Sequence, residues 1–172
     1  MLELEIEVLL RGIRSLGHEI GLHFDAGAYS TATWTSDSLE SALRRELSFI
    51  ENLLQARVTV FSWHNPEFFN LLDFDADEIA GLINVYARRL RRDCAYCSDS
   101  NGYWRFKPMG EVIREGHERL HLLTHPEWWT PEAMPPSERI DRAIRDRARK
   151  VRSDYDFLLE RFGRRNIAAH NS

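Results

Sequence analysis

The clearest pattern of apolar and polar positions is an alternation over residues 17–25, Gly-His-Glu-Ile-Gly-Leu-His-Phe-Asp. Successive side chains of an extended chain point to opposite faces, so the apolar positions 20, 22 and 24 share one face and His23 and Asp25 share the other. Residues 2–16, just before, carry apolar positions at helical spacing. The pattern predicts a helix that leads into a buried strand, with His23 and Asp25 at the C-terminal end of that strand.

The same reasoning predicts further elements along the chain. Runs of β-forming residues predict strands over 58–63, 94–98 and 119–124. Helical spacing of apolar residues predicts helices over 37–54, 109–116 and 137–162. Residues 79–92 are ambiguous between a helix and a short strand, and a helix is favoured for their second half.

Two local expectations concern the segments between these elements. Asp37, followed three residues later by Glu40, predicts a capping box at the start of the 37–54 helix. Residues 66–77 are loop-like, and we expect Phe68 and Phe69 to point inward.

Strands that alternate with helices indicate an α/β fold with a parallel sheet, either open or closed into a barrel. A chain of 172 residues is long enough for one domain with a substantial core, so we predict a single domain over 1–172. The amphipathic helix at 137–162 is expected to be laced with salt bridges and to lie over the body. Its regular apolar spacing would also suit a dimer contact.

Composition excludes several classes of function. The formal net charge of −4 gives no reason to expect nucleic-acid binding. No apolar run is long enough for a membrane span and no signal-like segment opens the chain, so a cytoplasmic location is the default. Cys94 and Cys97 are interpreted as structural thiols, with a redox pair or half of a zinc site as alternatives.

Chemically active side chains follow the predicted strands. His64, Asp99 and His125 each come directly after a strand, as His23 and Asp25 do. Parallel strands place their C-terminal ends on one rim, where α/β folds concentrate their chemistry. Imidazole and carboxylate groups together suit a divalent metal, with zinc favoured, and such an ion activates water for hydrolysis. A single histidine at a strand end is more often structural, and the recurrence of the pattern favours a site.

Aromatic residues in the loops beside this rim favour a sugar-like ligand, because flat rings stack on the C–H faces of sugars. The candidates for substrate binding are Tyr29, Trp104, Trp128 and Trp129. Trp104, like Trp63, is also explained as a core residue that covers the mouth of a barrel.

Four segments in order resemble the polysaccharide deacetylase family, which is carbohydrate esterase family four with its NodB homology domain. They are Gly-His-Glu-Ile-Gly-Leu-His23, Phe-Ser-Trp-His64-Asn-Pro66, Ser-Asp99-Ser-Asn-Gly-Tyr-Trp104 and Leu-Thr-His125-Pro-Glu-Trp128-Trp129. The match covers about residues 8–130. The resemblance implies an irregular (β/α) barrel whose members remove N- or O-acetyl groups from polysaccharides with one divalent metal.

The family's motifs transfer only in part. His23 matches the first histidine of the family's His-(Ser/Thr)-x-x-His motif, whose two histidines bind the metal. Phe24 replaces the hydroxyl residue of that motif, and Gly27 stands where the second histidine belongs. His64 takes the arginine position of the Arg-x-Pro motif, and Pro66 is kept.

The later motifs fit better, and the first is missing. Asp99 and Trp104 resemble the fourth motif, and Leu123-Thr-His125 fits the fifth, whose histidine protonates the leaving group. The family's first motif supplies a catalytic-base aspartate and a metal-binding aspartate, and no such stretch precedes residue 17. We therefore expect the chain to begin after the family's first strand, with the barrel incomplete and open beside residues 18–24. A homodimer or a partner chain would then cover that sheet edge.

These observations together predict a metal-dependent hydrolase that removes acetyl groups from a cell-surface polysaccharide or its precursor. His23, Asp25 and His125 are the predicted metal ligands, with Asp25 replacing the missing one. His125, Asp99 and His64 are the predicted catalytic residues. The alternative is a non-catalytic relative of the family that binds glycan or has a structural role.

Overall fold

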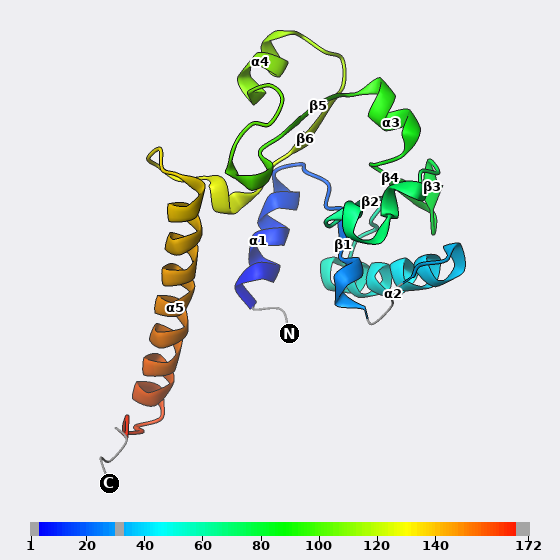
Figure 1. Ribbon diagram of the computed structural model, residues 1–172. Helices are drawn as coiled ribbons and strands as arrows, with labels where there is room; N and C mark the ends of the chain where they lie inside the picture. The colour runs from blue at the N-terminus through cyan, green and yellow to red at the C-terminus, as the bar shows by residue number, and fades with distance from the viewer. Residues whose placement is uncertain (1–3, 30–32, 168–172) are drawn as a thin grey trace. The chain divides into compact units, whose positions relative to one another are not determined.

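The computed structural model describes residues 4–29 and 33–167 (Figure 1). The chain divides into two compact units, Met1–Ala95 and Tyr96–Ser172. No helix in the described ranges is long and apolar enough to cross a membrane.

The first unit is built on a four-stranded mixed sheet with the strand order β1-β2-β4-β3. The strands are β1 (Leu22–Phe24), β2 (Val60–Trp63), β3 (Glu78–Ile79) and β4 (Leu82–Asn84). β2 runs parallel to both β1 and β4, whereas β3 is antiparallel to β4. The predicted α/β character with parallel strands is thus confirmed, and the strands of the described residues do not form a closed barrel. β1 lies at one edge of its sheet.

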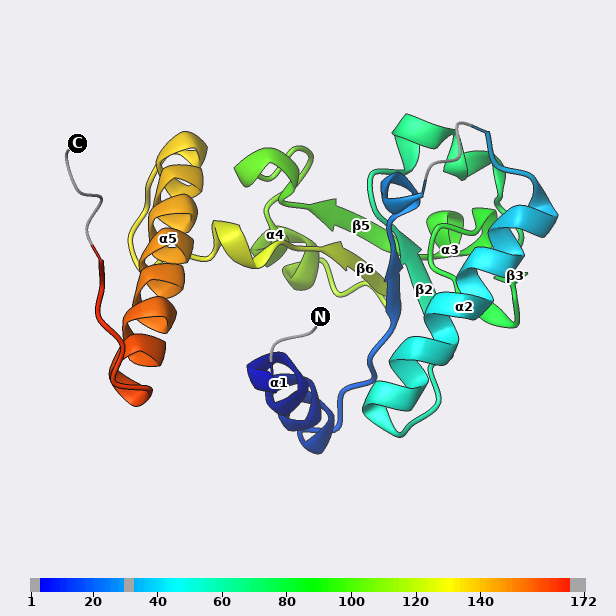
Figure 2. The same ribbon diagram turned by 90° about the horizontal axis from the view of Figure 1, so that it is seen from below.

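Two helices accompany this sheet. Helix α1 (Leu4–Ser15) confirms the predicted first helix, whose expected residues 2 and 3 lie outside the described ranges. The chain leaves α1 through Gly17, which has a φ of 88° that only glycine adopts without strain. Helix α2 (Ser36–Leu54) runs along one face of the sheet (Figure 2).

The start of α2 differs from the prediction. Thr35 is the N-cap: its hydroxyl accepts the backbone N–H of Ser38, and the Ser38 hydroxyl reaches back to the Thr35 N–H. The predicted box of Asp37 and Glu40 is therefore wrong. Thr35 has the extended backbone that a cap requires, so the helix begins one residue earlier and Asp37 falls within its first turn.

The core of the first unit lies between α2 and the sheet. It is made by buried side chains of β1, β2 and α2, chiefly Leu22, Phe24, Phe61, Trp63, Leu39, Leu43 and Leu54. The ring of Phe24 meets those of Trp34 and Trp63 edge to face, with centroids 5.7 and 5.9 Å away. This packing fixes β1, and with it the direction of the side chain between Leu22 and Phe24.

Residues 66–77, which the sequence predicts to be loop-like, contain two short 3₁₀ turns. Phe69 packs against the core as expected, but the prediction for Phe68 is wrong, because its side chain is 80% exposed. The two phenylalanines lie in the short 3₁₀ turn η2 (Pro66–Phe69). Neighbouring side chains of so tight a turn point in different directions, so both cannot face the core.

The ambiguous segment 79–92 contains a hairpin followed by a helix. β3 and β4 are joined by Ala80 and Gly81, both with positive φ (56° and 80°). Helix α3 (Arg88–Asp93) confirms the helix expected in the second half. The buried Asn84 side chain donates to the carbonyls of Phe74 and Ala76, which holds the preceding loop against β4.

The second unit contains the two-stranded sheet of β5 (Ala95–Ser98) and β6 (Leu120–Leu123), with helix α4 (Met109–Arg114) between them in the chain. The strands confirm the predictions for 94–98 and 119–124. The N–H of Asp99 donates to the carbonyl of Leu123 at 3.1 Å, so the C-terminal ends of β5 and β6 lie together.

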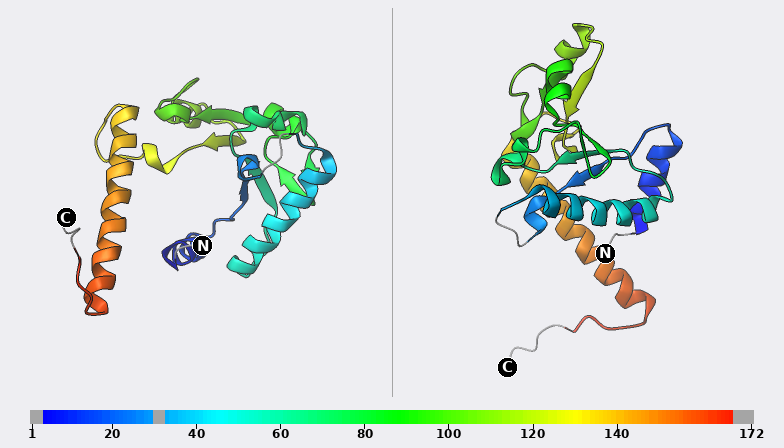
Figure 3. Two further views of the ribbon diagram at one scale, coloured as in Figure 1. Left: turned by 60° about the horizontal axis from the view of Figure 1, so that its bottom comes forward. Right: turned by 90° about the vertical axis from the view of Figure 1, so that its right-hand side faces the viewer.

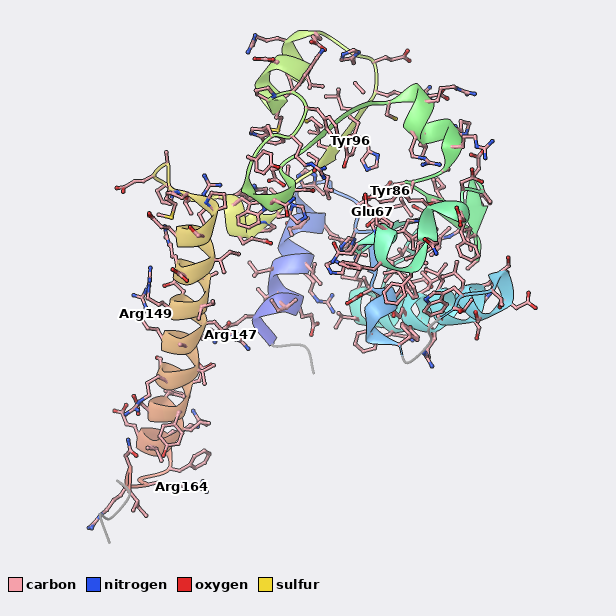
Figure 4. The ribbon with its side chains drawn as sticks, in the orientation of Figure 1. Glu67, Tyr86, Tyr96, Arg147, Arg149 and Arg164 are labelled. Carbon is pink, nitrogen blue, oxygen red and sulfur yellow. The ribbon has the colours of Figure 1, made fainter. Side chains whose placement is uncertain are left out.

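Helix α5 (Pro136–Arg161) confirms the predicted C-terminal helix and its salt bridges. It follows the 3₁₀ turn η5 (Pro126–Trp128), against which it packs (Figure 3). Lys150 and Arg152 each pair with an aspartate four residues ahead, and Arg149 pairs with Asp146 and points outward from the helix (Figure 4). None of the described side chains of α5 is buried.

Candidate functional site

Backbone pairing between β1 and β2 places three polar side chains on one face of the sheet. His23 lies between the buried residues Leu22 and Phe24 and is itself exposed. In the ladder it is paired with Ser62. The N–H of His64 donates to the carbonyl of Phe24 at 2.8 Å, which extends the ladder beyond β2. Because side chains alternate along a strand, His23, Ser62 and His64 project to the same side.

These side chains form a continuous hydrogen-bonded row. His23 Nδ1 is 2.7 Å from Ser62 Oγ, and His23 Nε2 is 3.2 Å from His64 Nδ1. His64 Nε2 is in turn 2.9 Å from the side-chain nitrogen of Asn65. The two imidazole rings are nearly perpendicular, at 86°, with centroids 5.3 Å apart.

The row determines where the protons lie. The Asn65 amide nitrogen is a donor, so His64 Nε2 accepts and the neutral His64 carries its proton on Nδ1. That proton is donated to His23 Nε2, and His23 therefore donates from Nδ1 to Ser62 Oγ. When both histidines are neutral, each ring N–H of the row has an acceptor.

Asn65 sets the geometry of the turn after β2. Its backbone is left-handed, with φ 44° and ψ 60°, a conformation that asparagine adopts more readily than most residues. Pro66 then opens η2 and ends the strand pairing. Asn65 thus sets the path of the chain after β2 and also forms a hydrogen bond with Nε2 of His64.

The structure gives Asp25 a structural contact. Its Oδ1 accepts the backbone N–H of Gly27 at 2.8 Å and caps the 3₁₀ turn η1 (Ala26–Ala28). Within residues 4–29 and 33–167, no three His, Cys, Asp or Glu side chains are grouped so that they could hold a metal ion.

Asp99 and His125 form the second candidate arrangement, in the second unit. Asp99 Oδ1 accepts from His125 Nδ1 at 2.7 Å, and Oδ2 accepts the backbone N–H of His125 at 3.1 Å. Asp99 is only 5% exposed, whereas about a third of the His125 side chain, 35%, is exposed. His125 Nε2 is the ring nitrogen left to exchange a proton with a ligand.

A buried thiol lies next to this pair in the chain. Cys97 on β5 is fully buried, and burial raises the pKa of its thiol, with the Asp99 carboxylate raising it further. Cys94 and Cys97 are both free thiols. A thiol that stays protonated is a poor nucleophile and a poor metal ligand, which agrees with the structural role predicted for Cys97.

The predicted substrate-binding aromatic residues differ in exposure. Tyr29 is half-buried, its hydroxyl donates to Glu46 at 2.5 Å, and burial is the main reason that its pKa is raised. Trp104 and Trp128 are also half-buried. Trp129 is 67% exposed. Of the four, Trp129 presents the most ring surface to solvent.

The structure joins four of the predicted residues in two pairs, and sequence reasoning missed two residues beside them. The structure joins His23 to His64 and Asp99 to His125. The missed residues are Ser62 and Asn65, which orient the histidines. The position of Ser62, two residues before His64 on the same strand, was the signal that could have identified it.

No protein-family model matches this chain, and no curated protein or solved structure shows significant similarity to it.

Proposed function

We propose that this protein is a metal-dependent hydrolase of the polysaccharide deacetylase type, which removes acetyl groups from a cell-surface polysaccharide or its precursor. The observation that carries the proposal is the hydrogen-bonded pair of Asp99 and His125. A buried carboxylate that holds one nitrogen of a partly exposed imidazole is a common arrangement for general acid–base catalysis.

The proton transfers follow from this geometry. Asp99 accepts from Nδ1, so Nε2 of a protonated His125 carries the proton that can be donated. Departure of an amine or alcohol from the tetrahedral intermediate requires such a donor. The Asp99 carboxylate keeps the ring in one orientation, because it accepts the Nδ1 proton and the backbone N–H of the same residue. This assigns to His125 the general-acid role that the family resemblance implies.

We propose that His23 takes part in the activation of water. A divalent ion, with zinc favoured, lowers the pKa of a bound water enough for attack on an acetyl carbonyl near neutral pH. His23 is the ligand that both the family motif and the structure support, since its ring is exposed and oriented by Ser62. Asp25 would have to give up its contact with Gly27 if it served as a ligand through Oδ1.

The acetylated carbohydrate is proposed to stack on exposed aromatic rings of the second unit. Trp129 follows η5 directly, and Tyr103 is 56% exposed in the loop after Asp99. These two rings also favour the alternative, a non-catalytic relative that binds glycan without hydrolysing it, because stacking needs neither an acid nor a metal.

Two surfaces are proposed for a homodimer or a partner chain. One is the edge of the sheet at β1, which among the strands of the described residues pairs with β2 alone. The other is the apolar stripe of α5, in which Ile144, Val151 and Leu158 are each at least half exposed.

Acetate release from a fully acetylated chito-oligosaccharide in the presence of Zn²⁺ tests the function. We expect wild-type protein to release acetate and His125→Gln to lower the rate by about 100-fold or more. His117→Gln is the matched control, because His117 also pairs with a carboxylate, that of the exposed Glu115. Glycan binding without acetate release from wild-type protein would establish the alternative.

A further inference from the structure

His23 Nε2 and His64 Nδ1 approach each other as two ligands of one metal ion do. Two imidazole nitrogens bound to a tetrahedral zinc ion at ~2.0–2.1 Å lie roughly 3.4 Å apart. The observed separation is 3.2 Å. The distance between the two nitrogens is therefore close to the one that a shared zinc ion requires.

The backbone fixes both histidines without the ion. His23 is held in the β1–β2 ladder opposite Ser62, and His64 continues the ladder through its N–H bond to Phe24. The strands are in turn fixed by the buried rings of Phe24 and Trp63. Ligands on a packed sheet lose little freedom when an ion binds, which favours affinity.

Each histidine also has a hydrogen-bond partner on the ring nitrogen that faces away from the other histidine. Metal-binding histidines usually have such a partner. His23 Nδ1 donates to Ser62 Oγ, which leaves the lone pair of Nε2 directed at His64. His64 Nε2 contacts Asn65. If the Asn65 amide turns by half a rotation, its oxygen accepts a proton from Nε2 and the lone pair of His64 Nδ1 becomes available.

We propose that His23 and His64 form a binding site for a divalent transition metal, with zinc as the expected ion and with His64 as a ligand in place of Asp25. The binding step is balanced: the proton that lies between the rings moves from Nδ1 to Nε2 of His64, and the ion takes its place. Two protein ligands leave the remaining positions open to water and substrate. The inference refines the ligand set of the proposed function and depends on that function only for the use of the metal.

Titration of the full chain with Zn²⁺, without any carbohydrate, tests the site. We expect one ion per chain, a loss of affinity of at least 10-fold in His23→Ala and in His64→Ala, and no further loss in the double variant. Ser62→Ala keeps both histidines and should weaken binding by about 10-fold. His18→Ala, an exposed histidine of the same unit, is the matched control and should bind as the wild type does.

Binding of Co²⁺ separates this site from the two thiols, because thiolate ligands produce intense charge-transfer absorption that imidazole ligands do not. A wild-type spectrum without thiolate bands supports the histidine site. Wild-type affinity in both histidine variants, or no binding by wild-type protein at millimolar metal, would overturn it. If a histidine variant fails to fold, the Zn²⁺ affinity of Ser62→Ala, which keeps both histidines, tests the site instead.

The inference and the proposed function fail separately. Acetate release that persists in His64→Ala with unchanged metal affinity would refute the ligand assignment and leave the hydrolase intact. Metal held by the histidine pair in a protein that releases no acetate would confirm the site and refute the hydrolase.

Discussion

Asp99 accepts two hydrogen bonds from a single residue, one from the ring Nδ1 of His125 and one from its backbone N–H. Because both carboxylate oxygens are used, the side chain of Asp99 orients the ring and also holds the chain that follows β6. A change at Asp99 is therefore expected to affect both chemistry and stability.

Asp99→Asn separates these two effects. The amide oxygen can still accept one bond, but the negative charge beside Nδ1 of His125 is lost. We expect acetate release to fall by about 100-fold or more and the free energy of unfolding to fall by ~1–3 kcal/mol. Kinetics and urea unfolding measure the two effects. An unchanged rate would show that His125 works without its buried carboxylate.

Two phenylalanines of the first unit should differ sharply in their contribution to stability. Phe24 is fully buried, whereas Phe68 is 80% exposed. We expect Phe24→Ala to lower the free energy of unfolding by ~3–5 kcal/mol and Phe68→Ala by no more than ~0.5 kcal/mol. Equal losses in chemical denaturation would contradict the observed direction of Phe68.

The cap of α2 can be tested in the same way. Thr35 holds the first turn through Ser38, whereas Glu40 makes a surface pair with Arg44. Thr35→Ala should cost ~1 kcal/mol and Glu40→Ala only about 0.3 kcal/mol. The reverse order in thermal unfolding would favour the capping box that the sequence predicted.

His121 should make the protein less stable in acid. Its ring lies against that of Tyr96, with the two ring centroids 5.3 Å apart. Tyr96 projects from β5 (Figure 4). Burial lowers the pKa of His121. The unfolded chain then binds a proton on His121 more readily than the folded chain does, so stability is lost as pH falls below the ordinary histidine value of about 6.5. His121→Phe should reduce the loss between about pH 7.5 and about pH 5. The exposed His18→Gln is the control, and equal pH dependence in all three proteins would exclude this role.

The apolar stripe of α5 predicts self-association. Val151 and Leu158 recur at heptad spacing and are 55% and 50% exposed. If a second copy covers this stripe, Val151→Glu with Leu158→Glu should convert a dimer to a monomer in sedimentation velocity. Wild-type protein that sediments as a monomer would contradict the prediction.

Long elements were predictable from the sequence, whereas short ones were not. The 19 residues of α2 and the 26 of α5 give several turns of apolar spacing, which identifies a helix with little ambiguity. β3 and β4 have two and three residues, too few for an alternation to stand out. Their turn also places Ala80 at positive φ, where a sequence signal would require glycine or asparagine.

The sequence could predict only those contacts of the candidate site that follow from two strands ending side by side. The rule that parallel strands end together explains why His23 meets His64 and why Asp99 meets His125. It could not give the contacts of Asp25, whose carboxylate bonds a backbone N–H two residues away. Such a local contact competes with any longer-range one, and spacing alone does not show which is formed.

The tryptophans that pack around Phe24 make the two units spectroscopically distinguishable. Of the five tryptophans, Trp34 and Trp63 belong to the first unit and are buried, whereas Trp104, Trp128 and Trp129 belong to the second. Replacement of the latter three by phenylalanine leaves tryptophan fluorescence that reports on the first unit alone. Its emission would shift to longer wavelength only when water reaches the core behind His23. Such a variant gives the first unit its own optical signal for folding and for the proposed binding of metal.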